Sequence, residues 1–179
     1  MANKCAAALS AEEPETARRR RVGAQSVSVE RTAVGKGIFA RRHFRADDTI
    51  GEILGDVVEG AEYGSDYCFR IGDELCLEPS PPFRYVNHCC DPNCEFDWFD
   101  VSEPGESQRK RRVFLFALRD IQPGEELTID YNWSAAAAIP CRCHSPNCRG
   151  WIVDLDQVKS IAGDGNRLPV ESTSGVAGD

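Results

Sequence analysis

Apolar and polar residues alternate in short segments between residues 27 and 131, and Gly, Asp and Ser bound most of these segments. A period of two over about four to eight residues is typical of a strand, whose successive side chains point to opposite faces. A helical period is weak throughout, except for a short turn near Asp154–Ile161. Strands are predicted at Val27–Glu30, Gly37–Ala40, Thr49–Leu54, Tyr67–Ile71, Leu75–Leu77, Asn93–Phe99, Arg112–Leu118 and Leu127–Tyr131. The predicted fold is mainly β, built of small sheets.

Polar stretches with Pro-Gly pairs separate the later strands. Ser102–Arg111 is suited to a hairpin connection, and Asp120–Glu126 predicts a turn into the last strand. Residues 1–24 lack apolar periodicity and are expected to form a disordered tail. The end of the chain, from about Asp164, is rich in Gly, Ser and Asp and is expected to be frayed.

The longest apolar runs fall far short of the roughly 18 residues that span a bilayer, and the N-terminus lacks a signal-peptide pattern. We therefore expect an intracellular protein without a membrane role. The formal net charge is −8; residues 1–26 carry +2 and residues 154–179 carry −3, which leaves −7 on the stretch between them. An acidic domain favours a cationic polypeptide partner over DNA phosphate, so no direct nucleic-acid role is expected.

The chain has 9 cysteines, an odd number that argues against a disulfide framework and for metal ligation. Structural zinc takes four ligands in a tetrahedron, and the three thiolates of a C-x-C-x4-C loop supply all but one. An iron–sulfur cluster is the minor alternative, and the lack of a C-x-x-C pair argues against a thiol redox protein. The loop holds Cys141, Cys143 and Cys148, and the candidates for the fourth ligand are Cys89, Cys90, Cys94 and His144.

Several further motifs, each weak alone, follow one another in a specific order. A Gly-x-Gly at Gly35–Gly37 comes first, then Tyr-x-Phe at Tyr67–Phe69, an Asn-His motif within Arg84–Asn93, and Gly-Glu-Glu-Leu-Thr-Ile-Asp-Tyr over Gly124–Tyr131. With the cysteine loop after them, residues 27–153 resemble the SET-domain protein lysine methyltransferases with a post-SET zinc segment. Tyr85 stands for the family's usual Phe, Cys89 for its Ser, and Ile129 for an aromatic residue.

The resemblance implies a SET fold of small β-sheets, whose C-terminal segment threads beneath the Asn87–Cys90 loop as a pseudoknot. It also implies a SET domain over residues 25–134, a zinc-binding post-SET segment over 135–153, and a short helix with a flexible tail over 154–179. The segment between Gly55 and Tyr67 is short and a cysteine-rich pre-SET region is absent, so the protein substrate stays open.

The activity that the resemblance implies is transfer of methyl groups from S-adenosylmethionine to a lysine of a basic protein such as a histone. It implies that Tyr131 is catalytic with Tyr67, that Tyr67 and Ile129 line the substrate channel, and that Cys90 completes a site for one structural zinc ion. The cofactor-binding residues are expected to be Gly35, Lys36, Gly37, Asn87, His88, Tyr131 and Trp151. With no aromatic ring at Ile129, we expect the reaction to pass monomethylation. The alternative is a catalytically inactive, zinc-stabilised SET-like module that binds basic protein tails.

Overall fold

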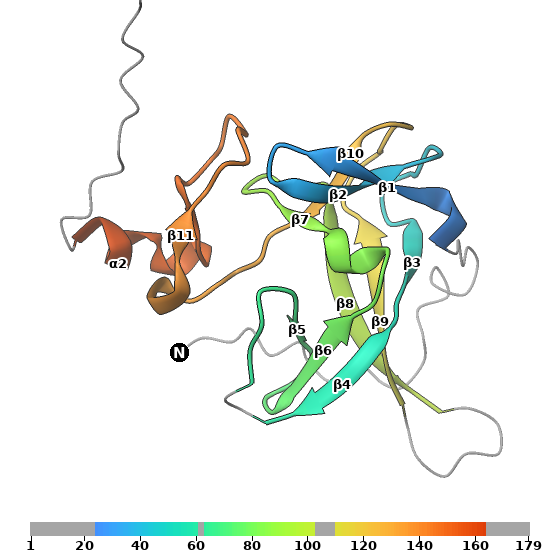
Figure 1. Ribbon diagram of the computed structural model, residues 1–179, viewed down its shortest axis with the longest axis horizontal. Coiled ribbons are helices and arrows are strands. Elements are labelled where there is room, and N and C mark those ends of the chain that lie inside the picture. Colours follow the sequence, from blue (N-terminus) through green and yellow to red (C-terminus); the bar gives the residue numbers. More distant parts are fainter. Residues whose placement is uncertain (1–23, 61–62, 103–109, 164–179) are drawn as a thin grey trace, which may run out of the picture. The chain divides into compact units, whose positions relative to one another are not determined.

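The computed structural model describes residues 24–60, 63–102 and 110–163, and these divide into two units (Figure 1). Unit 1 contains the described residues up to His88 together with those of Pro92–Ile129, and unit 2 contains Cys89–Asp91 and residues 130–163. Of the tail expected over residues 1–24, Ala24 alone lies within the described ranges, where it begins a 3-10 turn; the tail expected from about Asp164 and most of the Ser102–Arg111 connection lie outside them. Within those ranges, no helix has the length and apolar character needed to cross a membrane.

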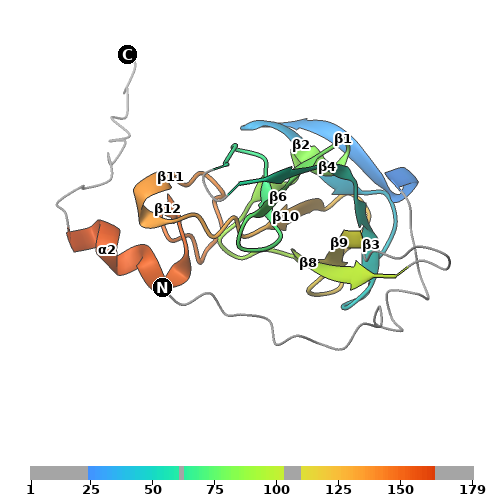
Figure 2. The same ribbon diagram turned by 90° about the horizontal axis from the view of Figure 1, so that it is seen from below.

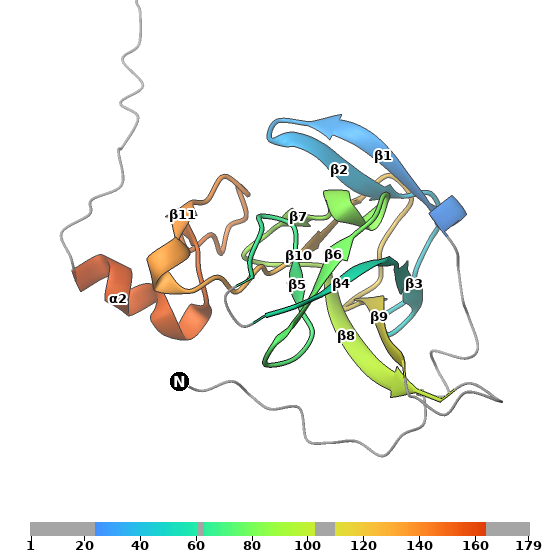
Figure 3. The ribbon, with the colours of Figure 1, turned by 60° about the horizontal axis from the view of Figure 1, so that its bottom comes forward.

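The first sheet of unit 1 begins with a hairpin that follows a 3-10 turn, η1 (Ala24–Ser26). Strands β1 (Val27–Thr32) and β2 (Gly35–Ala40) pair along their whole length, and their hairpin is seen in profile in Figure 3. The sheet continues from β2 to β10 (Glu126–Ile129) and then to β7 (Asn87–His88). Strand β10 is antiparallel to β2 and parallel to β7, so the Asn-His motif and the C-terminal motif lie side by side.

The second sheet has the order β3-β9-β8, with β9 (Lys110–Ala117) in the centre. Strands β8 (Cys94–Val101) and β9 form a long antiparallel pair, and β3 (Thr49–Ile53) lies along the other side of β9 (Figures 1 and 2). The central strand carries the buried side chains of Val113, Phe114 and Leu115. A near-continuous apolar run is typical of a strand that is buried on both faces.

The third sheet, with the order β4-β6-β5, contains a strand that the apolar pattern did not predict. Strand β4 (Gly55–Glu59) pairs with β6 (Leu75–Pro79), which in turn pairs with β5 (Phe69–Arg70). The sequence of β4 is Gly-Asp-Val-Val-Glu, and Val57 is 51% exposed. Because β4 is an edge strand and buries little, its sequence shows no clean alternation.

The strand predicted at Tyr67–Ile71 was wrong at its beginning, because Tyr67 lies in a turn and β5 starts at Phe69. The Ser65 hydroxyl accepts a hydrogen bond from the Tyr67 backbone N–H at 3.2 Å, and the Cys68 N–H reaches the Ser65 carbonyl at 3.4 Å. Such local hydrogen bonds offer the backbone an alternative to the ladder. A 3-10 turn, η2 (Phe83–Tyr85), follows β6 and leads into β7.

Unit 2 is built from short elements with little core. Strands β11 (Ile139–Pro140) and β12 (Trp151–Ile152) form a two-stranded antiparallel ladder. The helical turns are η3 (Ala135–Ala137), η4 (Leu155–Gln157) and α2 (Val158–Gly163). Among the side chains described in unit 2, Val153 alone is fully buried. A unit this poor in buried apolar surface needs a cross-link or a metal for its stability.

The last predicted strand, Leu127–Tyr131, ends two residues early in the structure, because β10 stops at Ile129. The Asp130 carboxylate accepts a hydrogen bond from the Asn132 backbone N–H at 3.2 Å, and Asn132 has a positive φ of 49°. This turn takes Tyr131 out of the sheet. The expected fold class, mainly β with small sheets, is confirmed.

Candidate functional site

Four cysteines of unit 2 come together in space. The Sγ atoms of Cys90, Cys141, Cys143 and Cys148 all lie within 4.8 Å of one another, and the thiols of Cys90 and Cys141 are 3.7 Å apart. Four thiol ligands at this spacing match the donor set of a structural zinc site. Cys90, on the loop after the Asn-His motif, is the member that is distant in sequence.

The β11–β12 ladder sets the conformation of the cysteine loop. It brings Pro140 opposite Trp151, so the loop between them is closed at its base, and the Cys141 N–H donates to the Gly150 carbonyl at 2.9 Å. Backbone N–H groups also point at sulfur, from Cys143 to Cys141 Sγ and from Gly150 to Cys148 Sγ, both at 3.4 Å. Gly150 has φ of +78°, a conformation that glycine adopts without a Cβ clash. The backbone therefore presents the sulfur atoms together and partly stabilises negative charge on them.

The electrostatics of the cluster fit a cation at its centre. Burial raises the pKa of the Cys90 thiol to about 11, and it raises the pKa of Cys141 further. Burial also acts to raise the pKa of Cys143, but hydrogen bonds from the backbone at Cys90 and Ser145 and from the thiols of Cys141 and Cys148 lower it to about 6. The protein alone thus favours a thiolate at Cys143 and disfavours one at Cys90 and Cys141. A divalent ion would supply the charge that allows all four to ionise.

The other candidates for the fourth ligand lie outside this group. The thiol of Cys94 is in β8 of unit 1, where it is 1% exposed and contacts Asn93 Oδ1 at 3.3 Å. Burial raises its pKa to about 12. Cys89 accepts a hydrogen bond from the Asp91 N–H at 3.5 Å, and His144 is exposed. Cys90 is the candidate that the structure brings to the three loop cysteines.

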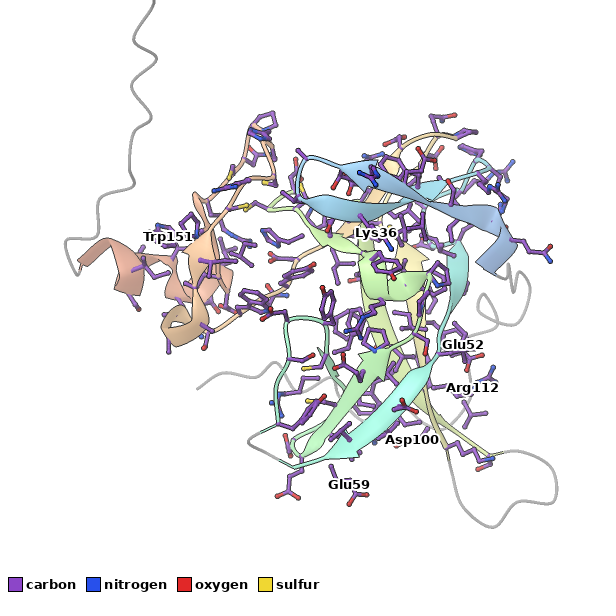
Figure 4. The ribbon with its side chains drawn as sticks, in the orientation of Figure 1. Lys36, Glu52, Glu59, Asp100, Arg112 and Trp151 are labelled. Carbon is purple, nitrogen blue, oxygen red and sulfur yellow. The ribbon has the colours of Figure 1, made fainter. Side chains whose placement is uncertain are left out.

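Tyr131 lies in unit 2, next to a half-buried ion pair. The Arg149 guanidinium donates two hydrogen bonds to the Asp130 carboxylate, at 2.5 and 2.6 Å, and the Tyr131 and Trp133 rings are 5.4 Å apart. Because Arg149 directly follows Cys148, this pair ties the segment before Tyr131 to the cysteine loop. Trp151 is half-buried in β12, and its carbonyl lies 4.0 Å from Cys90 Sγ (Figure 4).

Asn87 is held in one orientation in unit 1. Its Nδ2 donates to the Lys36 carbonyl at 3.0 Å and to Glu126 Oε1 at 2.7 Å. A Cβ at Gly37 would collide with that Glu126 oxygen and come within 3.0 Å of Asn87 Nδ2. The absence of a side chain at Gly37 therefore makes room for the Asn87–Glu126 contact, a task that the Gly-x-Gly motif alone did not indicate.

The remaining predicted site residues of unit 1 differ in their exposure to solvent. His88 in β7 and Ile129 in β10 are buried and lie opposite each other across the parallel pair. Gly35 and Lys36 are exposed at the start of β2, and the Lys36 ammonium lies 4.7 Å from the Tyr85 ring centre (Figure 4). Tyr67 is 48% exposed before β5.

Sequence reasoning missed the residues that hold these groups in place. Glu126, which orients Asn87, lies inside the Gly-Glu-Glu motif, and Arg149 follows the last cysteine of the loop, so both stood in segments already singled out. Asn93 was noted only as the end of the Asn-His motif. It is buried, and on either side of Leu127 its Nδ2 donates to the Glu126 carbonyl and its Oδ1 accepts from the Thr128 N–H.

Comparisons with known proteins identify the family of the chain. The SET domain family model matches residues 35–132. "Histone-lysine N-methyltransferase set1" of Dictyostelium discoideum is 32% identical over 129 residues, which are 63% of this chain and 8% of that protein. "Histone-lysine N-methyltransferase, H3 lysine-4 specific" of Saccharomyces cerevisiae is 33% identical over 135 residues, 65% of this chain and 12% of that protein. The chain thus spans only a small part of the length of these relatives.

Solved structures give the same result. The crystal structure of KRYPTONITE in complex with mCHH DNA, H3(1-15) peptide and SAH is similar with a TM-score of 0.61 and 27% identity, over 76% of this chain and 31% of that one. A second KRYPTONITE complex, with mCHG DNA and SAH, has a TM-score of 0.62 and 28% identity, over 76% of this chain and 30% of that one. With the small sheets, the ordered motifs and a family match over more than half of its residues, the chain belongs to the SET domain family.

Proposed function

We propose that the protein transfers methyl groups from S-adenosylmethionine to a lysine side chain of a basic protein, with the histone H3 tail as the first candidate. The orientation of Asn87 is the observation that carries this proposal. Both Nδ2 hydrogens are engaged by Lys36 and Glu126, so Oδ1 is the amide atom that remains to accept a hydrogen bond from the ammonium group of the cofactor. Relatives named as histone-lysine methyltransferases support the activity, and SAH and an H3 peptide in a similar structure support the cofactor and the substrate.

The cofactor-binding set that we propose is the one expected from the motifs: Gly35, Lys36, Gly37, Asn87, His88, Tyr131 and Trp151. When bound, S-adenosylmethionine supplies a methyl group on a sulfonium, so methyl transfer itself does not require a metal ion. The zinc ion proposed for Cys90, Cys141, Cys143 and Cys148 is structural.

The chain's own contribution to the reaction is to align the lysine and to favour its neutral form. A free lysine amine has a pKa of about 10.4 and is protonated at neutral pH. The apolar side chain of Ile129 disfavours an ammonium nearby, and the Tyr131 hydroxyl is proposed to orient the amine at the transfer point. Tyr67 is proposed as a wall of the lysine channel. Alignment of this kind supplies much of the acceleration in group transfer.

The acidic stretch of the chain suits a cationic substrate. We propose a peptide rather than DNA as the ligand of these residues, although the KRYPTONITE complexes contain DNA, because this chain covers about a third of that protein and carries net negative charge. A histone substrate would place the protein in the nucleus.

The test is transfer of labelled methyl groups to an H3(1–15) peptide, compared with a peptide in which arginine replaces histone H3 lysine 4. We expect transfer to the first peptide; because a similar protein is named as specific for lysine 4 of H3, we propose that lysine as the target and expect little transfer to the second. Tyr131→Phe, which keeps the ring and deletes only the hydroxyl, should leave the fold and the bound zinc intact and lose most of the transfer. The matched control is Tyr85→Phe, which also deletes one hydroxyl, at a position where Phe is usual in the family.

The inactive binding module is the rival. It predicts peptide binding without transfer to any basic protein, and Tyr131→Phe would then behave like the wild type. If the wild type transfers methyl groups and Tyr131→Phe transfers them equally well, the protein is a methyltransferase, but Tyr131 is not catalytic.

A further inference from the structure

The exposed ring of Tyr67 has a specific partner. The Arg84 guanidinium lies over it, with Cζ 4.0 Å from the ring centre. A guanidinium stacked on an aromatic face is attracted by the ring quadrupole and also restricts the ring's rotation. Tyr67 is therefore held on one face although almost half of its surface is open to solvent.

Arg84, in η2, is in turn fixed by a carboxylate on β6, the strand before that turn. Its NH1 nitrogen donates to Glu78 Oε1 at 2.6 Å and to the Pro79 carbonyl at 3.4 Å. Glu78 lies in β6, and its side chain is 20% exposed, against 32% for Arg84. The guanidinium thus stacks on Tyr67 from a position set by the sheet.

The same carboxylate also holds the backbone of Tyr67. The Ser65 hydroxyl donates to Glu78 Oε2 at 2.6 Å and accepts from the Tyr67 N–H at 3.2 Å. A closed loop therefore runs from the Tyr67 ring through Arg84, Glu78 and Ser65 to the Tyr67 backbone. The Tyr63 hydroxyl adds a third donor to Glu78 at 3.3 Å.

The charge of Glu78 suits this task. Hydrogen bonds from Ser65, and then from Arg84 and Tyr63, outweigh partial burial and hold the pKa of the Glu78 carboxyl below its ordinary value. The carboxylate is consequently ionised at neutral pH, where each of its hydrogen bonds is charge-assisted.

We propose that Arg84 and Glu78 are positioning residues that fix the ring of Tyr67 for the lysine substrate. The inference rests on the proposed function in one respect, since Tyr67 is taken there as a wall of the lysine channel. Arg84 and Glu78 act through Tyr67 and do not themselves touch the reacting atoms. Lysine in place of Arg84 would keep the charge but lose the planar face and the fork of donors.

The first experiment observes the ring and needs no activity. The full chain carries 4 tyrosines, so labelling with 3-fluorotyrosine gives few ¹⁹F resonances, and the spectrum of Tyr67→Phe assigns that of Tyr67. We expect Arg84→Lys to shift and broaden the Tyr67 resonance. Ser65→Ala, which keeps the Arg84–Glu78 pair, should shift it by less. A Tyr67 resonance that neither variant changes would overturn the proposal.

The matched control is Arg112→Lys. Arg112 also pairs with a carboxylate, donating to Glu52 at 2.6 and 2.5 Å, and its guanidinium lies 5.3 Å from the Phe114 ring (Figure 4). The substitution is chemically identical, and this pair lies in the β3-β9-β8 sheet, whereas Tyr67 precedes β5 of the β4-β6-β5 sheet. It should leave the Tyr67 resonance where it is.

The second experiment is a double-mutant cycle on methyl transfer. Arg84→Lys should lower kcat by about tenfold and change the peptide KM by less than about twofold, with unchanged cofactor affinity, because orientation is lost rather than binding. In a Tyr67→Ala background the same substitution should have no further effect. Additive losses would show that Arg84 acts independently of Tyr67 and would refute the positioning role. If the wild type transfers no methyl group, the proposed function fails, and the ¹⁹F result still decides whether Arg84 holds the ring.

Discussion

Replacing Asn93 with alanine is expected to destabilise unit 1 strongly. Asn93 is 4% exposed, and its Nδ2 donates to the Glu126 carbonyl at 2.8 Å while its Oδ1 accepts from the Thr128 N–H at 2.9 Å. These two backbone groups belong to β10, so the Asn93 amide provides the hydrogen bonds that a neighbouring strand would otherwise provide. Asn93→Ala removes both hydrogen bonds and offers the backbone nothing in return.

The expected cost follows from these two contacts. A typical intramolecular hydrogen bond contributes about 1 kcal/mol net, and a buried backbone group left without a partner costs roughly 1–3 kcal/mol. A water molecule entering the vacated space would recover part of this loss. We therefore expect the free energy of unfolding to fall by about 3 kcal/mol, which is a large share of the roughly 5–15 kcal/mol that stabilises a domain.

The assay is urea denaturation followed by circular dichroism at constant metal concentration, with Gln122→Ala as the control. Gln122 is exposed in the turn before β10, so loss of its side-chain amide should cost less than about 0.5 kcal/mol. Equal losses in the two variants would refute the idea that Asn93 completes the β10 ladder.

Asn93→Asp gives an independent check through its pH dependence. The introduced carboxyl would face the Glu126 carbonyl, and burial beside that oxygen should raise its folded-state pKa above the unfolded value. A group with a raised folded-state pKa stabilises the fold at low pH, and this contribution is lost as the pH rises through that pKa. The deficit relative to wild type should therefore be larger at pH 8 than at pH 5, and a deficit independent of pH would contradict the assigned contact.

Three further predictions concern the metal centre and the product. Cys90→Ser should lose most of the bound zinc in elemental analysis, whereas Cys94→Ser should keep about one ion per chain; the reverse pattern would make the assignment of Cys90 wrong. Removal of zinc with a chelator should change the fluorescence of Trp133 and Trp151 while the β-sheet signal of unit 1 persists, because unit 2 has so little buried core; unchanged fluorescence would contradict this. With wild-type enzyme in excess, mass spectrometry of a single-lysine peptide should show products with more than one methyl group. Ile129→Tyr should shift the product toward monomethyl-lysine. A wild-type reaction that stops at one methyl group would refute the role of Ile129.

Much of the fold could be predicted because most strands bury one face or both. The apolar run at Val113–Leu115 and the apolar residues Ile38 and Ala40 of β2 follow from that burial, whereas β1 buries Val27 and leaves Val29 41% exposed. Strand β4 escaped detection because an exposed edge strand needs no apolar face. The starts and ends of strands near Tyr67 and Tyr131 depend on the hydrogen bonds of Ser65 and Asp130, which a pattern of hydrophobicity does not contain.

The candidate site, too, could be predicted in part. The cysteine spacing alone predicted a metal and three of its ligands, and the family resemblance pointed to Cys90, which the structure places with the other three. The supporting residues could not be predicted, because they act through contacts between distant segments. Glu126 reaches Asn87 across 39 residues, and Arg84, held by Glu78 of β6, stacks on the ring of Tyr67.

Strand β10 has a consequence for how the chain can fold during synthesis. It is the last strand of unit 1, yet it pairs with β2, which lies near the beginning of the described chain, and with β7. Until Glu126–Ile129 has left the ribosome, β2 has a free edge, and Asn93 lacks the two backbone groups that it binds. Pairings this distant in sequence form slowly and expose unpaired strand edges in the meantime. Unit 1 must therefore fold after nearly all of its sequence has been made, and a nascent chain that ends before residue 126 has no route to the native sheet.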